Sequence, residues 1–230
     1  TILENIWITD SVIYMDDVYF FDFIAGNATL NNLNLQNLTI SNKEKDLIQF
    51  SLTNLVLNSS KFSRLTIKDT SYGIITSMGT IKTLAVLSNL TFENIVYTFA
   101  PGSFTQFTMA YLVRVHSNGY QIENLRFDNI VSEQVLLTTM TLASSISPLS
   151  VEFHELSYLN CRGSLKFYMD YAIMDNCIVA NNFLTYGPYS TNFFDGYAVN
   201  MTNCLVFNNT FGNNAYLATP KNFSMRNVSF

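Results

Sequence analysis

The stretch Leu30-Asn31-Asn32-Leu33-Asn34-Leu35-Gln36-Asn37 decides the fold of this 230-residue chain. Its eight positions read apolar, any, Asn, apolar, any, apolar, any, Asn. Apolar residues at positions 4 and 6 have the period of a β-strand with one face inward. Asn tolerates left-handed backbone angles, so the Asn at position 3 predicts a bend and the Asn at position 8 closes the strand.

The same octet recurs along the whole chain, which indicates a repeat architecture. The nine copies are Leu3–Asp10, Leu30–Asn37, Leu52–Ser59, Leu87–Asn94, Ile122–Asn129, Phe153–Asn160, Met174–Asn181, Met201–Asn208 and a truncated copy at Met225–Phe230. They start 21 to 35 residues apart, which is too far for hairpins and fits one coil of a three-sided solenoid. Strands of successive coils then pair in parallel, about 4.8 Å apart. Because crossovers are right-handed as a rule, we predict an all-β chain: one right-handed parallel β-helix of about nine coils over residues 1–230.

Asn at position 3 is expected to form a ladder, because stacked Asn side chains can hydrogen-bond from coil to coil. Glu155 is the one departure from Asn at this position. The predicted ladder residues are Asn5, Asn32, Asn54, Asn89, Asn124, Asn176, Asn203 and Asn227.

The composition agrees with short strands broken at regular intervals. The chain has 27 Asn, 19 Phe and 13 Tyr but only 9 Gly. Its 48% of apolar residues excludes a disordered chain, and its 13% of charged residues disfavours a helical bundle. Lys and Arg are scattered, so no basic stripe for nucleic acid is expected. A β-sandwich and a leucine-rich-repeat horseshoe are the alternatives, but the first needs Gly-rich hairpins and the second a more regular spacing.

The octet resembles the parallel β-helix repeat of pectate-lyase-like proteins, including its asparagine turn. With the Asn, Phe, Ile and Tyr bias, the chain also resembles β-helical ectodomains of very large surface proteins of ciliated protists. The resemblance implies a right-handed β-helix and, for the enzymes of the group, activity on polysaccharides. The Gly-His-Gly and Arg-Ile-Lys motifs of the resembled hydrolases do not occur here.

The acidic residues are mostly single, whereas glycoside hydrolysis needs two carboxylates at a fixed distance. A carbohydrate-active enzyme would draw on Asp16, Asp17, Asp128 and Glu152. A carbohydrate-binding module would instead use Tyr186, Tyr189 and Tyr197. His154, followed by Glu155, is expected on the surface, and His116 in a loop before a turn. We therefore expect no enzyme, no catalytic residue, no metal and no cofactor.

Two of the three cysteines share position 4 of adjacent octets. Cys177 and Cys204 should point inward and stack, at a Cα separation that allows a disulfide. Parallel side chains in register make that geometry awkward, so two buried free thiols are the alternative. Cys161 has no evident partner. At position 5 of the same two octets, Ile178 and Leu205 are expected to form an apolar pair on the surface.

Eight N-glycosylation sequons are the main surface signal. Those on expected outward or loop positions begin at Asn27, Asn37, Asn58, Asn200, Asn208 and Asn222. Asn89 and Asn227 also begin sequons, but the ladder should hold their side chains, so they are expected to be poorer acceptors.

No charged and then apolar leader follows Thr1, and the weakly polar stretch Val135–Leu149 is too short to span a bilayer. Both ends of the chain lie inside the repeat. The sequence predicts a non-catalytic structural or adhesive solenoid, an N-glycosylated rod that is extracellular or at the cell surface. Its expected partners are N-linked glycans and neighbouring coils or copies at open ends, with no nucleic acid and with a membrane only through an anchor outside this segment.

Overall fold

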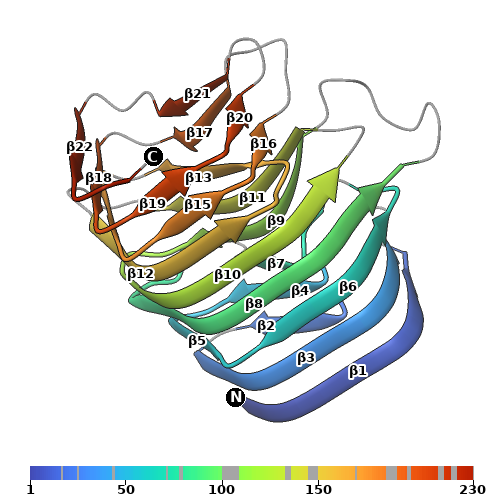
Figure 1. Ribbon diagram of the computed structural model, residues 1–230. Helices are drawn as coiled ribbons and strands as arrows, with labels where there is room; N and C mark the ends of the chain where they lie inside the picture. The colour runs from blue at the N-terminus through green and yellow to red at the C-terminus, as the bar shows by residue number, and fades with distance from the viewer. Residues whose placement is uncertain are drawn as a thin grey trace.

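The computed structural model describes residues 1–16, 18–24, 26–42, 45–70, 72–77, 80–99, 109–132, 136–144, 150–168, 170–184, 191–195, 198–211, 215–218 and 222–229. These residues form strands that pair in parallel and wind into a solenoid (Figure 1). Within these ranges no helix is long and apolar enough to cross a membrane. The predicted all-β parallel solenoid is confirmed, in line with the resemblance to right-handed parallel β-helices.

Two long sheets make up most of the solenoid. The larger sheet contains β1 (Ile2–Met15), β3 (Asn27–Asn42), β5 (Asn54–Asn58), β6 (Lys61–Lys68), β8 (Leu84–Thr98), β10 (Tyr120–Ser132), β12 (Ser150–Leu159), β14 (Tyr171–Asp175), β15 (Ile178–Ala180), β18 (Ala198–Thr202), β19 (Leu205–Phe207) and β22 (Asn222–Arg226). The second contains β2 (Phe21–Ile24), β4 (Ile48–Ser51), β7 (Ile75–Ser77), β9 (Met109–His116), β11 (Leu136–Ala143), β13 (Ser164–Tyr168), β17 (Thr191–Asp195) and β21 (Ala215–Ala218). A short third sheet pairs β16 (Phe183–Leu184) with β20 (Thr210–Phe211).

The structure has about six turns, fewer than the nine coils predicted. The nine octets mark the nine strands along the path of the larger sheet, from β1 to β22. A complete turn also needs strands on the other faces, and in the described part of the chain the third sheet consists of the pair β16 and β20. Parts of the last coils, such as residues 185–190 and 212–214, lie outside the described residues.

Left-handed bends divide each long strand at positions 3 and 8. Seventeen of the eighteen non-glycine residues with positive φ occupy these two positions, and all eighteen φ values lie between 50° and 61°. Position 3 holds Asn5, Asn32, Ser59, Asn89, Asn124, Glu155, Asn176, Asn203 and Asn227, and position 8 holds Asp10, Asn37, Arg64, Asn94, Asn129, Asn160, Asn181 and Asn208. Glu155 therefore bends the chain as Asn does, although a left-handed Glu costs roughly 1–2 kcal/mol.

The predicted register is correct for every octet except the third. Leu30 pairs with Leu57, not with Leu52, so the third octet is Leu57–Arg64. The prediction was wrong because this copy lacks the pattern: Ser59 stands at position 3, and Ser60 stands where other copies are apolar. Ser60 is buried, and its hydroxyl accepts the Leu33 N–H at 3.1 Å.

Repeated Asn side-chain hydrogen bonds run along the stack. At position 3, the side chain of Asn32 donates to Asn5 at 2.7 Å, Asn124 to Asn89 at 2.9 Å and Asn227 to Asn203 at 2.7 Å. Asn54 lies outside this ladder, which corrects the prediction, and instead donates to Asn27 at 2.9 Å. Position 8 forms a second set, which was not predicted: Asn129 bonds Asn94 at 2.9 Å and Asn208 bonds Asn181 at 2.8 Å.

The interior is filled by columns of apolar side chains from positions 1, 4 and 6. At position 6 the rings of Phe62, Phe92 and Phe127 stack, with centroids 4.8 and 5.0 Å apart, and Tyr158 continues the column at 6.0 Å. All four are fully buried. The Tyr158 hydroxyl is satisfied by Thr139 at 2.6 Å, as a buried polar group requires.

Candidate functional site

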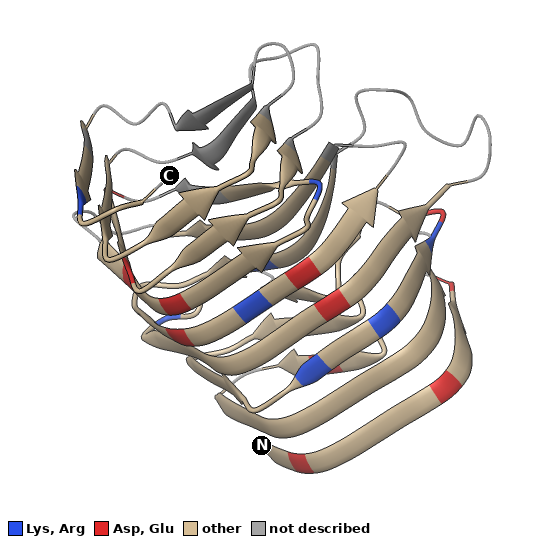
Figure 2. Ribbon diagram, in the orientation of Figure 1, with Lys and Arg blue, Asp and Glu red and all other residues tan. Residues whose placement is uncertain are grey.

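Charged residues occur mainly along the middle strands of the larger sheet (Figure 2). Lys61 pairs with Glu93 on the next coil at 2.6 Å, and Arg126 pairs with Asp128 at 2.6 Å. These pairs are partly exposed, so each contributes little stability. In both pairs the carboxylate is already bound to a basic side chain.

A cleft opens where β10 and β12 fail to pair. Tyr120 already pairs with Ala85 of β8, whereas pairing with β12 begins only at Ile122 and Phe153. The cleft has a volume of about 340 Å³ and is lined by Tyr120, Gln121, Ile122, Glu123, Ser150, Glu152 and His154. The cleft therefore places a histidine, two carboxylates, an amide and a hydroxyl around one hollow.

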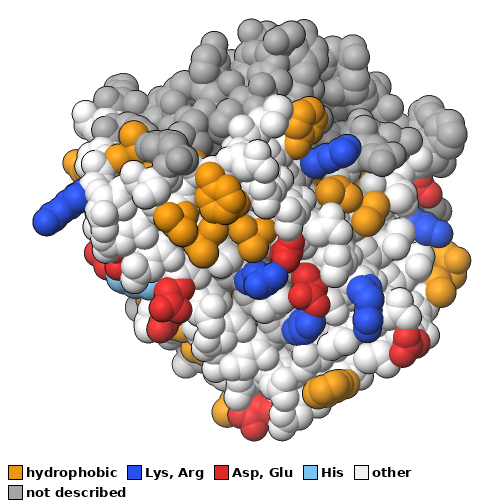
Figure 3. All heavy atoms as spheres, viewed as in Figure 1, with side chains coloured by type: hydrophobic (Ala, Val, Ile, Leu, Met, Phe, Trp, Pro, Cys, Tyr) orange, Lys and Arg blue, Asp and Glu red, His pale blue; other side chains and the backbone are white. Residues whose placement is uncertain are grey.

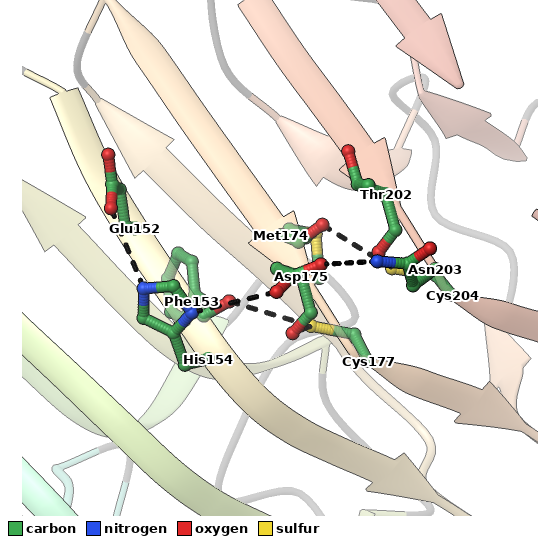
Figure 4. Close-up of polar contacts among 9 residues, drawn as sticks. All are labelled: Glu152, Phe153, His154, Met174, Asp175, Cys177, Thr202, Asn203 and Cys204. Atoms are coloured by element: carbon green, nitrogen blue, oxygen red, sulfur yellow. Dashed lines mark hydrogen bonds and ion pairs between the residues drawn. The ribbon is translucent and has the colours of Figure 1, made fainter. Parts of the chain in front are cut away.

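His154 lies between two carboxylates at this cleft (Figure 4). Its Nε2 is 3.5 Å from Glu152 of the same strand, and its Nδ1 is 3.9 Å from Asp175 of the next coil. Asp175 is held in turn by the side-chain amide of Asn203 at 3.0 Å. The surface position predicted for His154 is confirmed, but its neighbours are Glu152 and Asp175 and not Glu155. Both ring nitrogens thus face acidic groups at ion-pair distances.

Tyr120 forms a fixed wall of the cleft because its hydroxyl is anchored. This oxygen lies 2.6 Å from the Ala143 carbonyl and accepts the Ser117 N–H at 2.9 Å. Burial raises the pKa of Tyr120 far above its usual value, so the phenol stays protonated. Tyr120 therefore gives the cleft a fixed, uncharged wall.

The three described acidic residues considered for carbohydrate chemistry are not brought together. Asp16 directly follows β1, Asp128 bonds to Arg126 and Asn160, and Glu152 lies at the cleft. Asp17 lies outside the described residues, as do Tyr186, Tyr189 and Tyr197. Among the described residues, no group of three or more His, Cys, Asp and Glu side chains could hold a metal ion.

His116 is the last residue of β9 rather than a loop residue, and it is half-buried. Its backbone N–H donates to the Ser77 hydroxyl at 2.7 Å. Burial, followed by the nearby charge of Arg114, lowers the pKa of the His116 imidazole. The prediction of a loop position for His116 was wrong, because β9 continues up to the turn and includes this residue.

Cys177 and Cys204 lie one above the other on neighbouring coils, as position 4 predicts. Both are free and fully buried, so the structure has stacked thiols and no disulfide. The Cys177 thiol approaches the Asp175 carbonyl at 3.4 Å, and the Cys204 thiol approaches the Thr202 carbonyl at 3.1 Å. A hydrogen bond between the two thiols raises the pKa of Cys177 and lowers that of Cys204. Cys161 is buried apart from them, and burial raises its pKa to about 12.

Asp46 is a buried carboxyl that the sequence reasoning missed. It is 5% exposed, accepts the Gly73 N–H at 2.6 Å and accepts the Tyr111 hydroxyl at 3.2 Å. Burial raises its pKa to about 6, against the lowering effect of these hydrogen bonds. It lies before β4, outside any octet, so no pattern in the sequence marked it.

Several sequon asparagines form side-chain hydrogen bonds, including two at outward positions. Asn37 and Asn208 were expected on outward or loop positions and are exposed, but their amides also donate to Asp10 and to Asn181 at position 8. They are therefore held in the same way as Asn89, which donates to Asn58 at 3.0 Å. Asn27 is exposed, and it uses its side-chain oxygen to accept from Asn54.

An apolar patch covers the outer face near the C-terminal coils (Figure 3). The predicted pair of Ile178 and Leu205 is in register, and Leu205 is exposed. Phe207 and Phe183, which the sequence reasoning did not single out, are also exposed on this part of the molecule. Arg162 lies over the Phe183 ring at 5.8 Å.

Comparison with known proteins adds no further assignment. The chain matches no protein-family model, no curated protein and no solved structure.

Proposed function

We propose that this chain is a non-catalytic structural or adhesive β-solenoid, an N-glycosylated rod that works outside the cell or at its surface. One observation carries the proposal: backbone pairing, aromatic stacking and Asn side-chain bonds all run in register from coil to coil. Solenoid repeats contact only their neighbours, so a continuous register makes the stack stiff along its axis. Such stiffness suits a spacer or a scaffold.

The coil formed by β1 supports a role in stacking. Leu3, Ile6 and Ile8 are only partly buried, whereas their counterparts one coil later, Leu33 among them, are almost fully buried. A further coil or a second copy packed on β1 would cover these side chains and pair the outer edge of the strand. We therefore propose neighbouring coils or copies as partners, together with N-linked glycans.

Stacking is tested by sedimentation and electron microscopy over a range of concentrations. We expect end-to-end particles whose length grows with concentration, and Ile6→Glu should abolish them. Trp7→Glu is the matched control, because Trp7 is 64% exposed and points away from the core. A chain that stays monomeric at all concentrations, or an effect of Trp7→Glu equal to that of Ile6→Glu, would contradict stacking.

Glycosylation is tested by secretion from a eukaryotic host and glycosidase treatment. We expect the treated chain to migrate faster in a gel and Asn27→Gln to remove one step of that shift. Asn54→Gln is the control, because Asn54 bonds directly to Asn27 but begins no sequon. A secreted chain with no shift would contradict the proposed glycoprotein.

A carbohydrate-active or carbohydrate-binding role is the second candidate, and the cleft between β10 and β12 favours it. Glu123, Glu152, Gln121 and Ser150 offer hydrogen-bonding groups of the kind that recognise sugar hydroxyls. On a glycan array, we expect Glu152→Gln to remove any binding, whereas Glu4→Gln on the first coil should not. Equal binding by the two variants would exclude the cleft.

A further inference from the structure

Five sulfur-containing side chains gather at one corner of the C-terminal coils. Met174, Met201 and Met225 occupy position 1 of three successive coils and pair in register. Cys177 and Cys204 occupy position 4 of the first two. Positions 1 and 4 lie on either side of the bend at Asn176 and Asn203, and both face the core.

The cysteines and the two nearer methionines are closed off from water. Cys177, Cys204, Met174 and Met201 are each at most 1% exposed. The Cys204 sulfur lies 3.4 Å from the carbonyl oxygen of Met174, so the two residues are adjacent across the coils (Figure 4). A thiol pair and thioethers in a dry interior are soft ligands, which select Cu(I) over harder ions.

The spacing of the coils fits a two-coordinate metal. Neighbouring parallel strands lie roughly 4.8 Å apart. Metal–thiolate bonds are roughly 2.3 Å long, so two of them in line span roughly 4.6 Å. Two sulfurs that follow this strand spacing stand at about the separation that one ion between them requires. The Cys204 sulfur points towards the coil that carries Cys177, because it lies 3.4 Å from the Met174 carbonyl oxygen of that coil.

From this geometry we propose that Cys177 and Cys204 form a buried site for a soft monovalent metal ion, Cu(I) or its analogue Ag(I), lined by Met174 and Met201. On binding, both thiols lose their protons and two sulfur–metal bonds form, so one cation replaces two protons. A structural zinc site is a poorer fit, because zinc takes four ligands. The described His, Cys, Asp and Glu residues supply no third protein ligand.

The test is an anaerobic Cu(I) titration of the reduced chain against a competing chromophoric chelator. Metal is added both to the folded chain and during refolding, because the site is closed in the folded state. We expect one Cu(I) per chain, an X-ray absorption spectrum with sulfur ligands only, and a higher melting temperature, since a ligand that binds only the folded state stabilises it. Ag(I) should act in the same way.

The variants are chosen so that the fold survives. Val228 occupies position 4 on the next coil, so Cys177→Val and Cys204→Val place in the column a residue that it already accepts. Each should lower the apparent affinity at least roughly a hundred-fold, a larger effect than the loss of a residue that only orients a metal ligand. Cys161→Ala, at a third buried thiol, should bind as the wild type does.

Three outcomes would overturn the proposal. One is Cu(I) binding that persists in the Cys177→Val and Cys204→Val double variant. Another is an equal loss in Cys161→Ala. The last is a native chain that binds no Cu(I). This holds if both thiols are free, and also if they are already joined as a disulfide, which a mass two hydrogens lower would reveal. The circular dichroism of each metal-free variant must match that of the wild type, and a variant that fails this check is replaced by Cys177→Ala or Cys204→Ala.

Discussion

The rings of Phe62 and Phe92 lie 4.8 Å apart and within 5° of parallel, so the aromatic spacing equals the spacing of the strands that carry them. The rings can therefore stack without distorting the strands, and the strands can pair without separating the rings. Phe127 extends the stack at 5.0 Å on the next coil. Position 6 is therefore where side-chain packing most directly reinforces the register of the coils.

Replacing the middle ring should be costly. We expect Phe92→Ala to lower the free energy of unfolding by about 3–5 kcal/mol, because it leaves a cavity between two rings that cannot close it. Phe92→Leu, which keeps most of the volume, should cost less. Urea denaturation measures both. A loss below about 1 kcal/mol for Phe92→Ala would show that the stack relaxes and does not define the register.

The bend at Asn124 combines a backbone preference with a ladder bond, and two substitutions separate them. Asn124 has φ of 50° and donates to Asn89 at 2.9 Å. Asn124→Gly keeps the left-handed backbone easy and removes the bond, so we expect a loss of about 1 kcal/mol. Asn124→Ala also incurs the left-handed cost and should lose roughly 1–2 kcal/mol more. Thermal or urea unfolding measures the stability of both variants. If Asn124→Gly is no more stable than Asn124→Ala, the left-handed backbone is not the reason for Asn at this position.

The buried Asp46 should make stability depend on pH in an unusual direction. Its folded pKa, about 6, lies above the ordinary value of 3.8, so the folded chain binds the proton more tightly than the unfolded chain. The contribution of this group is therefore most favourable at low pH and is lost as pH rises from about 4 through about 6. The loss is at most about 3 kcal/mol.

Asp46→Asn removes this dependence. We expect the variant to be more stable than the wild type at pH 7.5 and similar to it at pH 4.5, as measured by urea denaturation at both values. Asp69→Asn, at an exposed carboxyl, serves as the control and should leave the difference between the two pH values unchanged. If the Asp46→Asn variant and the wild type have equal free energies of unfolding at both pH values, Asp46 is not the group whose protonation changes the stability.

Gly73 and Gly26 should respond differently to Ala. A Cβ on Gly73 would lie 2.6 Å from the Tyr111 carbonyl oxygen, which is backbone and cannot move freely. At Gly26, with φ of 82°, a Cβ would meet nothing within 4 Å, so only the left-handed cost of roughly 1–2 kcal/mol applies. We expect Gly73→Ala to be clearly the more destabilising in a thermal melt. If Gly26→Ala were the more destabilising, the backbone around Gly73 would be able to move away from Tyr111 and make room for the added Cβ.

The fold could be predicted because the octet encodes both a strand period and its bends. The inward columns at Leu33, Leu125 and Cys204, for example, are as the pattern placed them. The third octet failed because Ser59 and Arg64 adopt the left-handed conformation without the residue that favours it. Neighbouring coils impose this conformation on them, and no local pattern records such a constraint.

Little of the candidate site was open to the same reasoning. The neighbours of His154 depend on the coil that lies beside it and on the residue at which β10 and β12 begin to pair. Both depend on the lengths of the loops between the strands. Asp46 is buried by residues that are distant in sequence, such as Tyr111. Cys177 and Cys204 were predictable because they belong to the repeat itself.

The spacing of the ladder bonds has a consequence for how this chain can change in length. Asn5 and Asn32, and likewise Asn27 and Asn54, are 27 residues apart and occupy equivalent places on successive coils. A whole coil can therefore be gained or lost by duplication or deletion without disturbing any column, whereas a single residue inserted between two bends would turn an inward side chain outward. Evolution of such a protein is expected to proceed in steps of one coil, with finer variation confined to the loops that join the sheets.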